Sequence, residues 1–525
     1  MTGVQTCALP ISMCLKQVKR HLYSGLFWEL LWGYIISNMG IKKIIESKAF
    51  RITVLIGIII GAFIVRLYKI NEPLADWHSW RQVDTASVSR TYVEQGIDLL
   101  NPRYHDVSSI QTGIPNPKGL RLVELPIFNV IHAFLTISFP NLSLEFWGRM
   151  TSIIFSLFSV LFLFLLGERY IGKWGGILAA FFFAFIPFNI FYSRVILPEP
   201  TAVALSLGAL WFFSQFIEKD NQTYLYISAV VFCLALLVKP FSIFYAVPMI
   251  WLIRNKWGDI TYVFKNSKLL IKFLIFANII LVPILLWRYL LSLHPEGVPF
   301  FTWAFNGDHI RFRPSFWRWI FAERLGKMIL GIWGIVPFIF SIIQKGKSDF
   351  VRYFMIGAFL YVSTIATANV RHDYYQTFII PMVAFGVAAG GYYLWNQNIF
   401  NKLITRTLFV FSTLLMLMVG YFQVIDLYNI NHPEIIRVGA RVDEITPKDS
   451  LVVAPYNGDT AFLYQTKRWG WPAVDSDIDN IIARGADYYV SVNYDDDTNK
   501  FMKRFVTVEK TPEYIILDLH KEISQ

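Results

Sequence analysis

Long runs of apolar residues, separated by short polar loops, occupy most of the chain between residues 52 and 425. A helix needs about 20 mostly apolar residues to cross the hydrocarbon core of a membrane, where it must close its own backbone hydrogen bonds. The pattern therefore predicts an all-α polytopic membrane protein with about eleven transmembrane helices and at most about thirteen. The predicted helices cover residues 52–69, 149–167, 174–194, 200–217, 223–240, 241–254, 268–291, 326–344, 351–368, 376–395 and 404–425.

The run LPIFNVIHAFLTISFP, residues 125–140, is shorter, contains Asn129 and His132, and has a proline near each end. We predict that it is a helix lying in the membrane interface. With that choice, and with the N-terminus in the cytoplasm, the alternate loops all face the cytoplasm and are mostly basic, as the positive-inside rule requires. These loops are residues 167–174, 215–222, 253–258, 344–352 and 396–406.

The composition agrees with a membrane protein, because 55% of the residues are hydrophobic, only 16% are charged, and the mean hydropathy is +0.45. The net charge of +11 would fit nucleic acid binding. Many of the basic residues, however, lie in the short loops, where they act as topology signals, and we exclude a nucleic acid partner. The three cysteines, Cys7, Cys14 and Cys233, form no spacing typical of a disulfide or metal framework.

The N-terminal residues are unusual. Residues 1–12, MTGVQTCALPIS, look like the translation of a sequencing adapter, so we expect them to be an artefact. Residues 13–51 are the predicted N-terminal cytoplasmic segment, and Met39 is an alternative native start because a short basic stretch follows it directly.

The tail from residue 426 to 525 loses the apolar density of the preceding spans. SLVVAP, ADYYVSVN and EYIILDLH predict strands, and DSDIDNIIARG predicts a helix that stops at its glycine. These elements indicate a small α/β domain, and an odd number of spans places it outside the cytoplasm. It either binds a ligand or packs as a cap on the outer loops.

Unusual polar residues gather in the segments predicted to face outward, 70–148, 195–199, 292–325 and 369–375, and at the Lys239-Pro240 turn. Charged groups at a membrane boundary are costly unless they are paired or used, so we interpret these as a functional site. The candidates are Asp76, His78, Arg81, Asp84, Glu124, Arg194, Glu199, Lys239, Arg311, Arg313, Arg371, His372, Tyr374 and Tyr375.

Simpler structural roles compete with this interpretation. Asp84 begins the sequence DTAS before a helical pattern, which is typical of a helix N-cap. Anchoring to lipid headgroups, interfacial hydrogen bonding or an aromatic belt are the alternatives for Arg90, Arg103, Arg318, His78, His372, Tyr374 and Tyr375. Glu199 lies between Pro198 and Pro200 with few local partners, so a purely structural role explains it less well.

Four stretches resemble a known family. They are VDTASVSRTYVEQGIDLLNPRY, LVELPIFNVIHAF, the segment from GRMTSIIF to RVILPEP, and RHDYYQTFIIPMVAF. Together, over residues 50 to 430, they are similar to the GT-C glycosyltransferases that use polyprenyl-phosphate sugars, the group of bacterial aminoarabinose transferases and protein O-mannosyltransferases. The resemblance implies a GT-C-like catalytic module at residues 52–425, with a large first outer loop at residues 70–148.

The resemblance also implies roles for individual residues. Asp84 occupies the family's first-loop catalytic acid position and Glu199 its second acidic position, while Glu124 and Lys239 match further active-site groups. Two departures stand out. Position 199 is Glu where many members have Asp, and the sequence ELP at 124–126 lacks the basic residue of the family's EKP-like site. Contacts to a phosphate therefore fall to other residues.

The implied reaction transfers a hexose or pentose from a polyprenyl phosphate of the undecaprenyl type to a hydroxyl of a lipid, glycan or protein acceptor, with inversion. Asp84 would be the general base. Cationic groups would offset the charge of the departing phosphate. These groups would come from Arg194, Lys239, Arg311, Arg313 and Arg371, with Asp76, His78 and Arg81 in support of Asp84.

Two alternatives stay open. No cofactor is certain, but a divalent cation bound jointly by Asp84 and Glu199 is compatible with the sequence, although no dedicated ligand set is present. A transporter or flippase for a lipid-linked sugar is the alternative function, which the absence of internal repeats disfavours. For either function the expected location is the plasma (inner) membrane, with the site and the tail on the extracytoplasmic side.

Overall fold

The computed structural model describes residues 41–259, 261–343 and 349–523. The predicted adapter sequence, the alternative start at Met39, Cys7 and Cys14 lie outside these ranges. The chain divides into two compact units, residues 1–57 and residues 58–525. The described part of the first unit contains α2 (Ile41–Glu46) and the beginning of α3 (Lys48–Arg66), and Arg51 donates a hydrogen bond of 2.9 Å to the Glu46 carbonyl.

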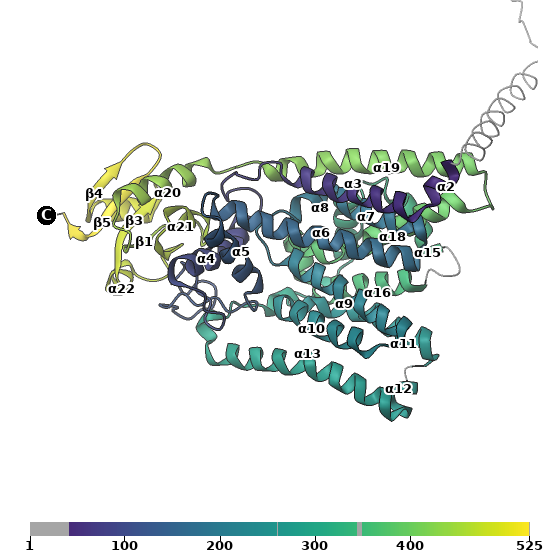
Figure 1. Cartoon of the computed structure of the whole chain (residues 1–525). Coiled ribbons are helices and arrows are strands. Elements are labelled where there is room, and N and C mark those ends of the chain that lie inside the picture. Colours follow the sequence, from purple (N-terminus) through teal and green to yellow (C-terminus); the bar gives the residue numbers. More distant parts are fainter. Residues whose placement is uncertain (1–40, 260, 344–348, 524–525) are drawn as a thin grey trace, which may run out of the picture. The chain divides into compact units, whose positions relative to one another are not determined.

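The second unit is mainly helical (Figure 1). Up to residue 293 its elements are α4 (Ser79–Gln95), α5 (Ile127–Ser138), α6 (Leu144–Tyr170), α7 (Lys173–Phe185), α8 (Pro187–Tyr192), α9 (Glu199–Lys219), α10 (Gln222–Val238), η1 (Pro240–Tyr245), α11 (Ala246–Trp257), α12 (Thr261–Lys265) and α13 (Ser267–Leu293). Up to residue 428 they are η2 (Pro295–Gly297), η3 (Thr302–Ala304), η4 (Ile310–Phe312), α14 (Pro314–Arg318), the π-helix η5 (Trp319–Ile329), α15 (Ile335–Ile343), α16 (Asp349–Thr364), α17 (Ala366–Arg371), η6 (Asp373–Phe378), α18 (Ile380–Asn396), α19 (Lys402–Val424) and η7 (Ile425–Tyr428).

Among the described residues, five helical stretches are long and apolar enough to cross a membrane, which indicates a multi-pass membrane protein. They are Lys48–Arg66, Leu144–Tyr170, Glu199–Lys219, Ser267–Leu293 and Lys402–Ile445. The count of eleven stays a prediction, because several predicted spans are interrupted. The run 174–194, for example, divides at Pro187, whose ring and missing N–H favour the start of a new helix.

The run at 125–140 forms the helix α5, which has 12 residues and is too short for a full span by itself. Its position in the membrane interface stays a prediction.

The long helices differ in how far they are enclosed. Of the 18-residue apolar stretch in each helix, 83% is buried in α9, whereas only 11% is buried in α13. α9 packs between α6 and α10, while α13 packs on α10 and leaves most of its apolar surface exposed (Figure 1). α9 is therefore central in the helical part, and α13 presents a surface suited to lipid.

The C-terminal module, from α20 (Pro433–Ile445) to β5 (Ile515–Glu522), contains a five-stranded sheet in the order β2-β1-β3-β5-β4 (Figure 1). β1 pairs in parallel with β2 and β3, and β5 pairs antiparallel with β3 and β4. The remaining elements are β1 (Leu451–Val453), α21 (Ala461–Thr466), β2 (Trp469–Trp471), α22 (Ile478–Ala483), β3 (Ala486–Ser491), α23 (Asp496–Met502) and β4 (Phe505–Lys510).

The three predicted strands and the predicted helix of the tail correspond to β1, β3, β5 and α22. The sequence reading missed β2 and β4. β2 has only three residues, and the burial of β4 does not alternate along the strand, so neither leaves a clear period-two pattern.

The C-terminal module shares its core with the segment at residues 70–148. Val83 and Ala86 of α4 and Phe128 of α5 belong to one buried cluster with Val452 of β1 and Phe462 of α21. The backbone of residues 105–107 also continues the sheet, because Val107 N donates to Gly470 O and Gly470 N donates to His105 O, both at 2.9 Å. These contacts fix the module against the segment that carries the candidate acids.

Candidate functional site

A cavity of about 480 Å³ opens beside the first turn of α4. Residues 121–124, the turn after α10, the end of α13, residues 298–305 and η6 form its other sides. Five charged side chains line it, the cations of Arg81, Arg121, Lys239 and Arg288 and the carboxylate of Glu124. The rest of the lining is largely aromatic and aliphatic, including Trp80, Phe300, Phe301, Trp303, Tyr374 and Tyr375. The excess of positive charge beside an apolar surface suits an anionic group that carries a hydrocarbon chain.

Glu124 is the centre of a buried ionic network in this lining. Its Oε1 atom lies 2.5 Å from Arg81 Nη2 and 2.5 Å from Lys239 Nζ, and Lys239 Nζ lies 3.0 Å from Glu199 Oε1. Burial opposes the charge of Glu124, but Arg81 and Lys239 outweigh it and lower its pKa to about 2. Glu124 is therefore ionised and forms ion pairs with both Arg81 and Lys239.

Local structure places Glu199 and Lys239 side by side. Glu199 is in the first turn of α9 and Lys239 directly follows α10, where the next residue, Pro240, favours an extended conformation at Lys239. α9 and α10 are joined by residues 220–221 and pack together, so the start of one helix lies near the end of the other. An acid at a helix start and a base at a helix end are also favoured by the helix dipoles.

Asp84 lies in the middle of α4, is 1% exposed, and has both carboxylate oxygens occupied. Arg121 Nη2 donates to Oδ2 at 2.7 Å, Thr460 Oγ1 donates to Oδ1 at 2.7 Å, and Gln111 Nε2 approaches Oδ2 at 3.4 Å. Asp84 does not line the large cavity, but Arg121 and Gln111, which contact it, do. The alternative that Asp84 caps the helix is wrong, because α4 begins at Ser79, five residues earlier.

Three of the predicted residues, His78, His372 and Asp76, do not line this cavity. The imidazole of His78, whose pKa is lowered to about 4 by burial, lies 5.5 Å from the rings of His372 and Tyr374. His372 in turn lies 5.6 Å from the ring of Trp303. Asp76 accepts a hydrogen bond of 2.7 Å from Gln82, and burial raises its pKa. The structure gives these side chains packing and hydrogen-bonding contacts, and their proposed substrate contacts stay predictions.

The predicted phosphate-binding arginines are mostly placed elsewhere. Arg194 donates to the carbonyls of Tyr68 and Lys69 at 2.8 and 3.0 Å, so it supports the chain after α3. Arg311 donates to the Ser363 carbonyl at 2.9 Å. Arg313 and Arg371 are exposed and lie near Asp308. None of these four arginines lines the large cavity, so a direct role in it is not supported for them.

The sequence candidates did not include Arg121, Arg288 and Trp80 of the cavity lining, or Thr460, which contacts Asp84. Arg121 had a usable signal, since it lies three residues before Glu124 in the same polar segment. Arg288 lies within the predicted span 268–291, and a charge in an apolar run is itself a functional signal. Trp80 had no usable sequence signal, because aromatic residues are common throughout the chain. Thr460 had none either, because it is 376 residues from its partner Asp84.

The donor set does not favour a metal ion shared by Asp84 and Glu199. The Asp84 oxygens accept hydrogen bonds from Arg121 and Thr460, while Glu199 faces Lys239. Within the described ranges, no group of three or more His, Cys, Asp or Glu side chains is arranged to bind a metal. These residues therefore do not fit the joint cation site that the sequence left open.

Comparison with known proteins agrees with the helical fold. Residues 127–287 match the family model described as dolichyl-phosphate-mannose-protein mannosyltransferase. The chain is similar in structure to ArnT from Cupriavidus metallidurans bound to undecaprenyl phosphate, with a TM-score of 0.58, 12% identity, and coverage of 90% of this chain and 98% of that one. No curated protein matches the chain in sequence.

A second similar structure is the oligosaccharyltransferase AglB from Archaeoglobus fulgidus in complex with an inhibitory peptide and a dolichol-phosphate. It has a TM-score of 0.52 and 10% identity, and the match covers 83% of this chain and 69% of that one. The class of fold is therefore that of the GT-C glycosyltransferases. The resemblance inferred from the sequence is confirmed, by the matched family segment and by the fold.

Proposed function

We propose that the protein is a membrane glycosyltransferase. It transfers a sugar from a polyprenyl phosphate of the undecaprenyl type to a hydroxyl group of a cell-envelope acceptor, with inversion. The observation that carries this proposal is the cavity in which Arg81, Arg121, Lys239 and Arg288 gather beside an apolar surface. We place the cavity on the extracytoplasmic side of the plasma membrane, because the basic loops predict that orientation.

The donor would bind with its phosphate at the cations and its lipid at the apolar side. Arg288 and Leu291 lie near the end of α13, the long helix whose apolar surface is largely exposed. A polyprenyl chain could follow this surface while its phosphate reaches the four cations. The two similar structures support this class of donor, since one protein is bound to undecaprenyl phosphate and the other is in complex with a dolichol-phosphate.

Asp84 is the proposed general base. The acceptor hydroxyl oxygen would form a bond to the anomeric carbon, its proton would pass to Asp84, and the bond from that carbon to the phosphate oxygen would break. The polyprenyl phosphate would leave with the electron pair, stabilised by the surrounding cations. Gln111 makes the longest of the three contacts to Asp84, at 3.4 Å, so the acceptor hydroxyl would displace its amide.

The first experiment measures transfer directly. Purified protein in vesicles receives undecaprenyl phosphates carrying radiolabelled mannose, glucose or aminoarabinose, together with envelope extract from the source cells as acceptor. We expect label from at least one donor to become covalently attached to an acceptor, with undecaprenyl phosphate released. Label that crosses the vesicle membrane on an unchanged donor would instead establish a lipid-linked sugar transporter and refute the proposal.

Arg288 provides a test of the donor site. It is exposed on α13, its guanidinium lies 5.4 Å from the centre of the Phe301 ring, and no ion pair to a carboxylate is found for it in the described part of the chain. Replacing Arg288 with Ala should weaken binding of undecaprenyl phosphate about fivefold, the usual upper range for an exposed charge. Titration in detergent measures this. Arg318→Ala, an exposed arginine that does not line the cavity, is the control, and equal affinity of both variants would contradict the assignment.

A further inference from the structure

We propose that the C-terminal module is part of the active site and that Thr460 is a positioning residue for Asp84. This inference rests on the proposed function. Thr460 Oγ1 donates a hydrogen bond of 2.7 Å to Asp84 Oδ1, and the two residues are 6% and 1% exposed. A residue of the tail thus contacts the candidate base directly.

The hydroxyl of Thr460 does not cap the helix that begins after it. Thr460 is the N-cap residue of α21, a position where threonine commonly accepts a hydrogen bond from its own helix. Here it makes no such bond, and Asp459 Oδ1 instead accepts from Ala461 N at 2.7 Å. Because the neighbouring aspartate accepts the hydrogen bond at the start of the helix, the threonine hydroxyl can donate to Asp84.

Thr460 and Arg121 together fix the orientation of the Asp84 carboxylate. Arg121 holds one oxygen at 2.7 Å and Thr460 holds the other at the same distance. Two donors on different oxygens restrict rotation of the carboxylate, and a base held in one orientation needs less rearrangement to receive a proton. The arginine comes from the first outer loop and the threonine from the C-terminal module.

The turn before Thr460 also reaches the large cavity. Asn457 and Gly458 have φ values of 54° and 77°, in the left-handed region that suits a tight turn. Gly458 lines the cavity itself. The same turn therefore contributes to the cavity surface and brings Thr460 to Asp84.

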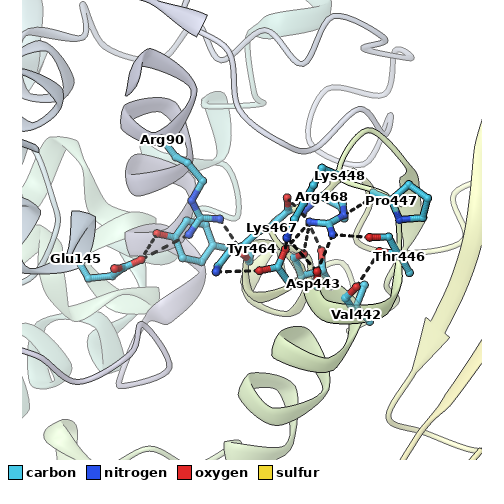
Figure 2. A network of polar contacts seen from close by, with 11 residues as sticks. Arg90, Glu145, Val442, Asp443, Thr446, Pro447, Lys448, Tyr464, Lys467 and Arg468 are labelled. Carbon is cyan, nitrogen blue, oxygen red and sulfur yellow. Dashed lines mark hydrogen bonds and ion pairs between the residues drawn. The ribbon is translucent and has the colours of Figure 1, made fainter. Parts of the chain in front are cut away.

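Figure 2 shows how α21 is held in place on both sides. Toward α4 and α6, the Arg90 guanidinium lies 3.7 Å from the centre of the Tyr464 ring and donates to the Tyr464 carbonyl at 2.9 Å. The Tyr464 hydroxyl donates to Glu145 at 2.7 Å. Toward α20, Arg468 Nη1 donates to Asp443 at 2.7 Å. This network fixes the distance between α21 and the helix that carries Asp84.

The test replaces Thr460 with Val, which preserves the shape and removes the hydroxyl. A hydrogen bond to a charged group is worth enough that we expect kcat to fall about 10- to 100-fold. The KM for the labelled undecaprenyl-phosphate sugar should stay unchanged, because Thr460 does not line the donor cavity. Thr460→Ser, which keeps the hydroxyl, should retain most of the activity. Thr446→Val is the matched control, since Thr446 is also buried in the module but donates only to the Val442 carbonyl.

The outcomes separate the two proposals. If the unmodified protein transfers sugar and Thr460→Val does so at the same kcat, the inference is overturned while the function stands. If Thr460→Ser loses as much activity as Thr460→Val, the hydroxyl is not what matters and the inference is again overturned. No transfer by the unmodified protein from any of the three donors refutes the function and the inference together. Should Thr460→Val fail to fold, Thr460→Ala gives the same readout, and an unchanged kcat overturns the inference.

Discussion

Replacing Asp84 with Asn is expected to lower sugar transfer at least about 1000-fold, because an amide cannot accept the proton of the acceptor hydroxyl. Asn has nearly the same shape as Asp. Its one carbonyl oxygen can still accept the hydrogen bond from Arg121, while its NH2 group can donate to the Thr460 hydroxyl oxygen, so the protein should insert and fold. The measurement is the initial rate of transfer of labelled sugar, together with the thermal unfolding temperature in detergent.

Asp106 offers a matched control for this substitution. It is a buried aspartate of the same segment, residues 70–148, accepts hydrogen bonds from Ser108 N and the Tyr104 hydroxyl, and does not line the large cavity. Burial raises its pKa to about 6. Asp106→Asn should leave the rate of transfer within about twofold of the unmodified protein, since its environment already disfavours the charge. Near-normal transfer by Asp84→Asn would remove Asp84 from the chemistry.

Much of the ionic centre could be predicted from the sequence. Glu124, Glu199 and Lys239 lie in three separate segments, yet the structure joins them in one network, as the family resemblance implied. For Glu199 the signal was local, a carboxylate between two prolines at the edge of an apolar run with few neighbours to pair with, whereas the family resemblance implied Glu124 and Lys239. Partners for such groups must come from elsewhere in the fold, so the clustering itself was predictable.

The arginines were harder to assign because a guanidinium on a long side chain can reach a backbone carbonyl as readily as a ligand. Arg194 and Arg311 donate to backbone carbonyls, whereas Arg121 donates to the Asp84 carboxylate, and residue type alone does not separate these outcomes. Arg288 was hidden for the opposite reason, since its apolar surroundings made it part of a predicted span. Exposure and contacts, which only the fold supplies, distinguish these cases.

Some features of the fold could also be predicted from the sequence and others could not. Strong periodicity and apolar length predicted the helical class and the α/β tail, whereas the helix breaks at Pro187 and between η5 and α15 were not predicted. An interrupted helix keeps the apolar composition of an intact one, so hydropathy alone does not reveal it. The contact of Thr460 with Asp84 depends on how the module packs on α4, which no local pattern encodes.

Replacing Lys239 with Met is expected to destabilise the protein by about 3–5 kcal/mol, because removing one partner leaves a buried charge without compensation. Glu124 would keep Arg81 at 2.5 Å, but Lys239 is the one ion-pair partner found for Glu199 among the described residues. The thermal unfolding temperature in detergent measures the loss. Binding of undecaprenyl phosphate should weaken as well, since a cation of the cavity is gone.

Adding Glu199→Gln to Lys239→Met separates these two effects. The neutral amide no longer needs a cation, so the double variant should recover most of the lost stability, whereas binding of undecaprenyl phosphate should stay weak. If the double variant is as unstable as Lys239→Met, Glu199 is not the group that Lys239 neutralises. If both variants bind undecaprenyl phosphate like the unmodified protein, Lys239 balances the two acids without contacting the donor, and the phosphate would depend on Arg81, Arg121 and Arg288.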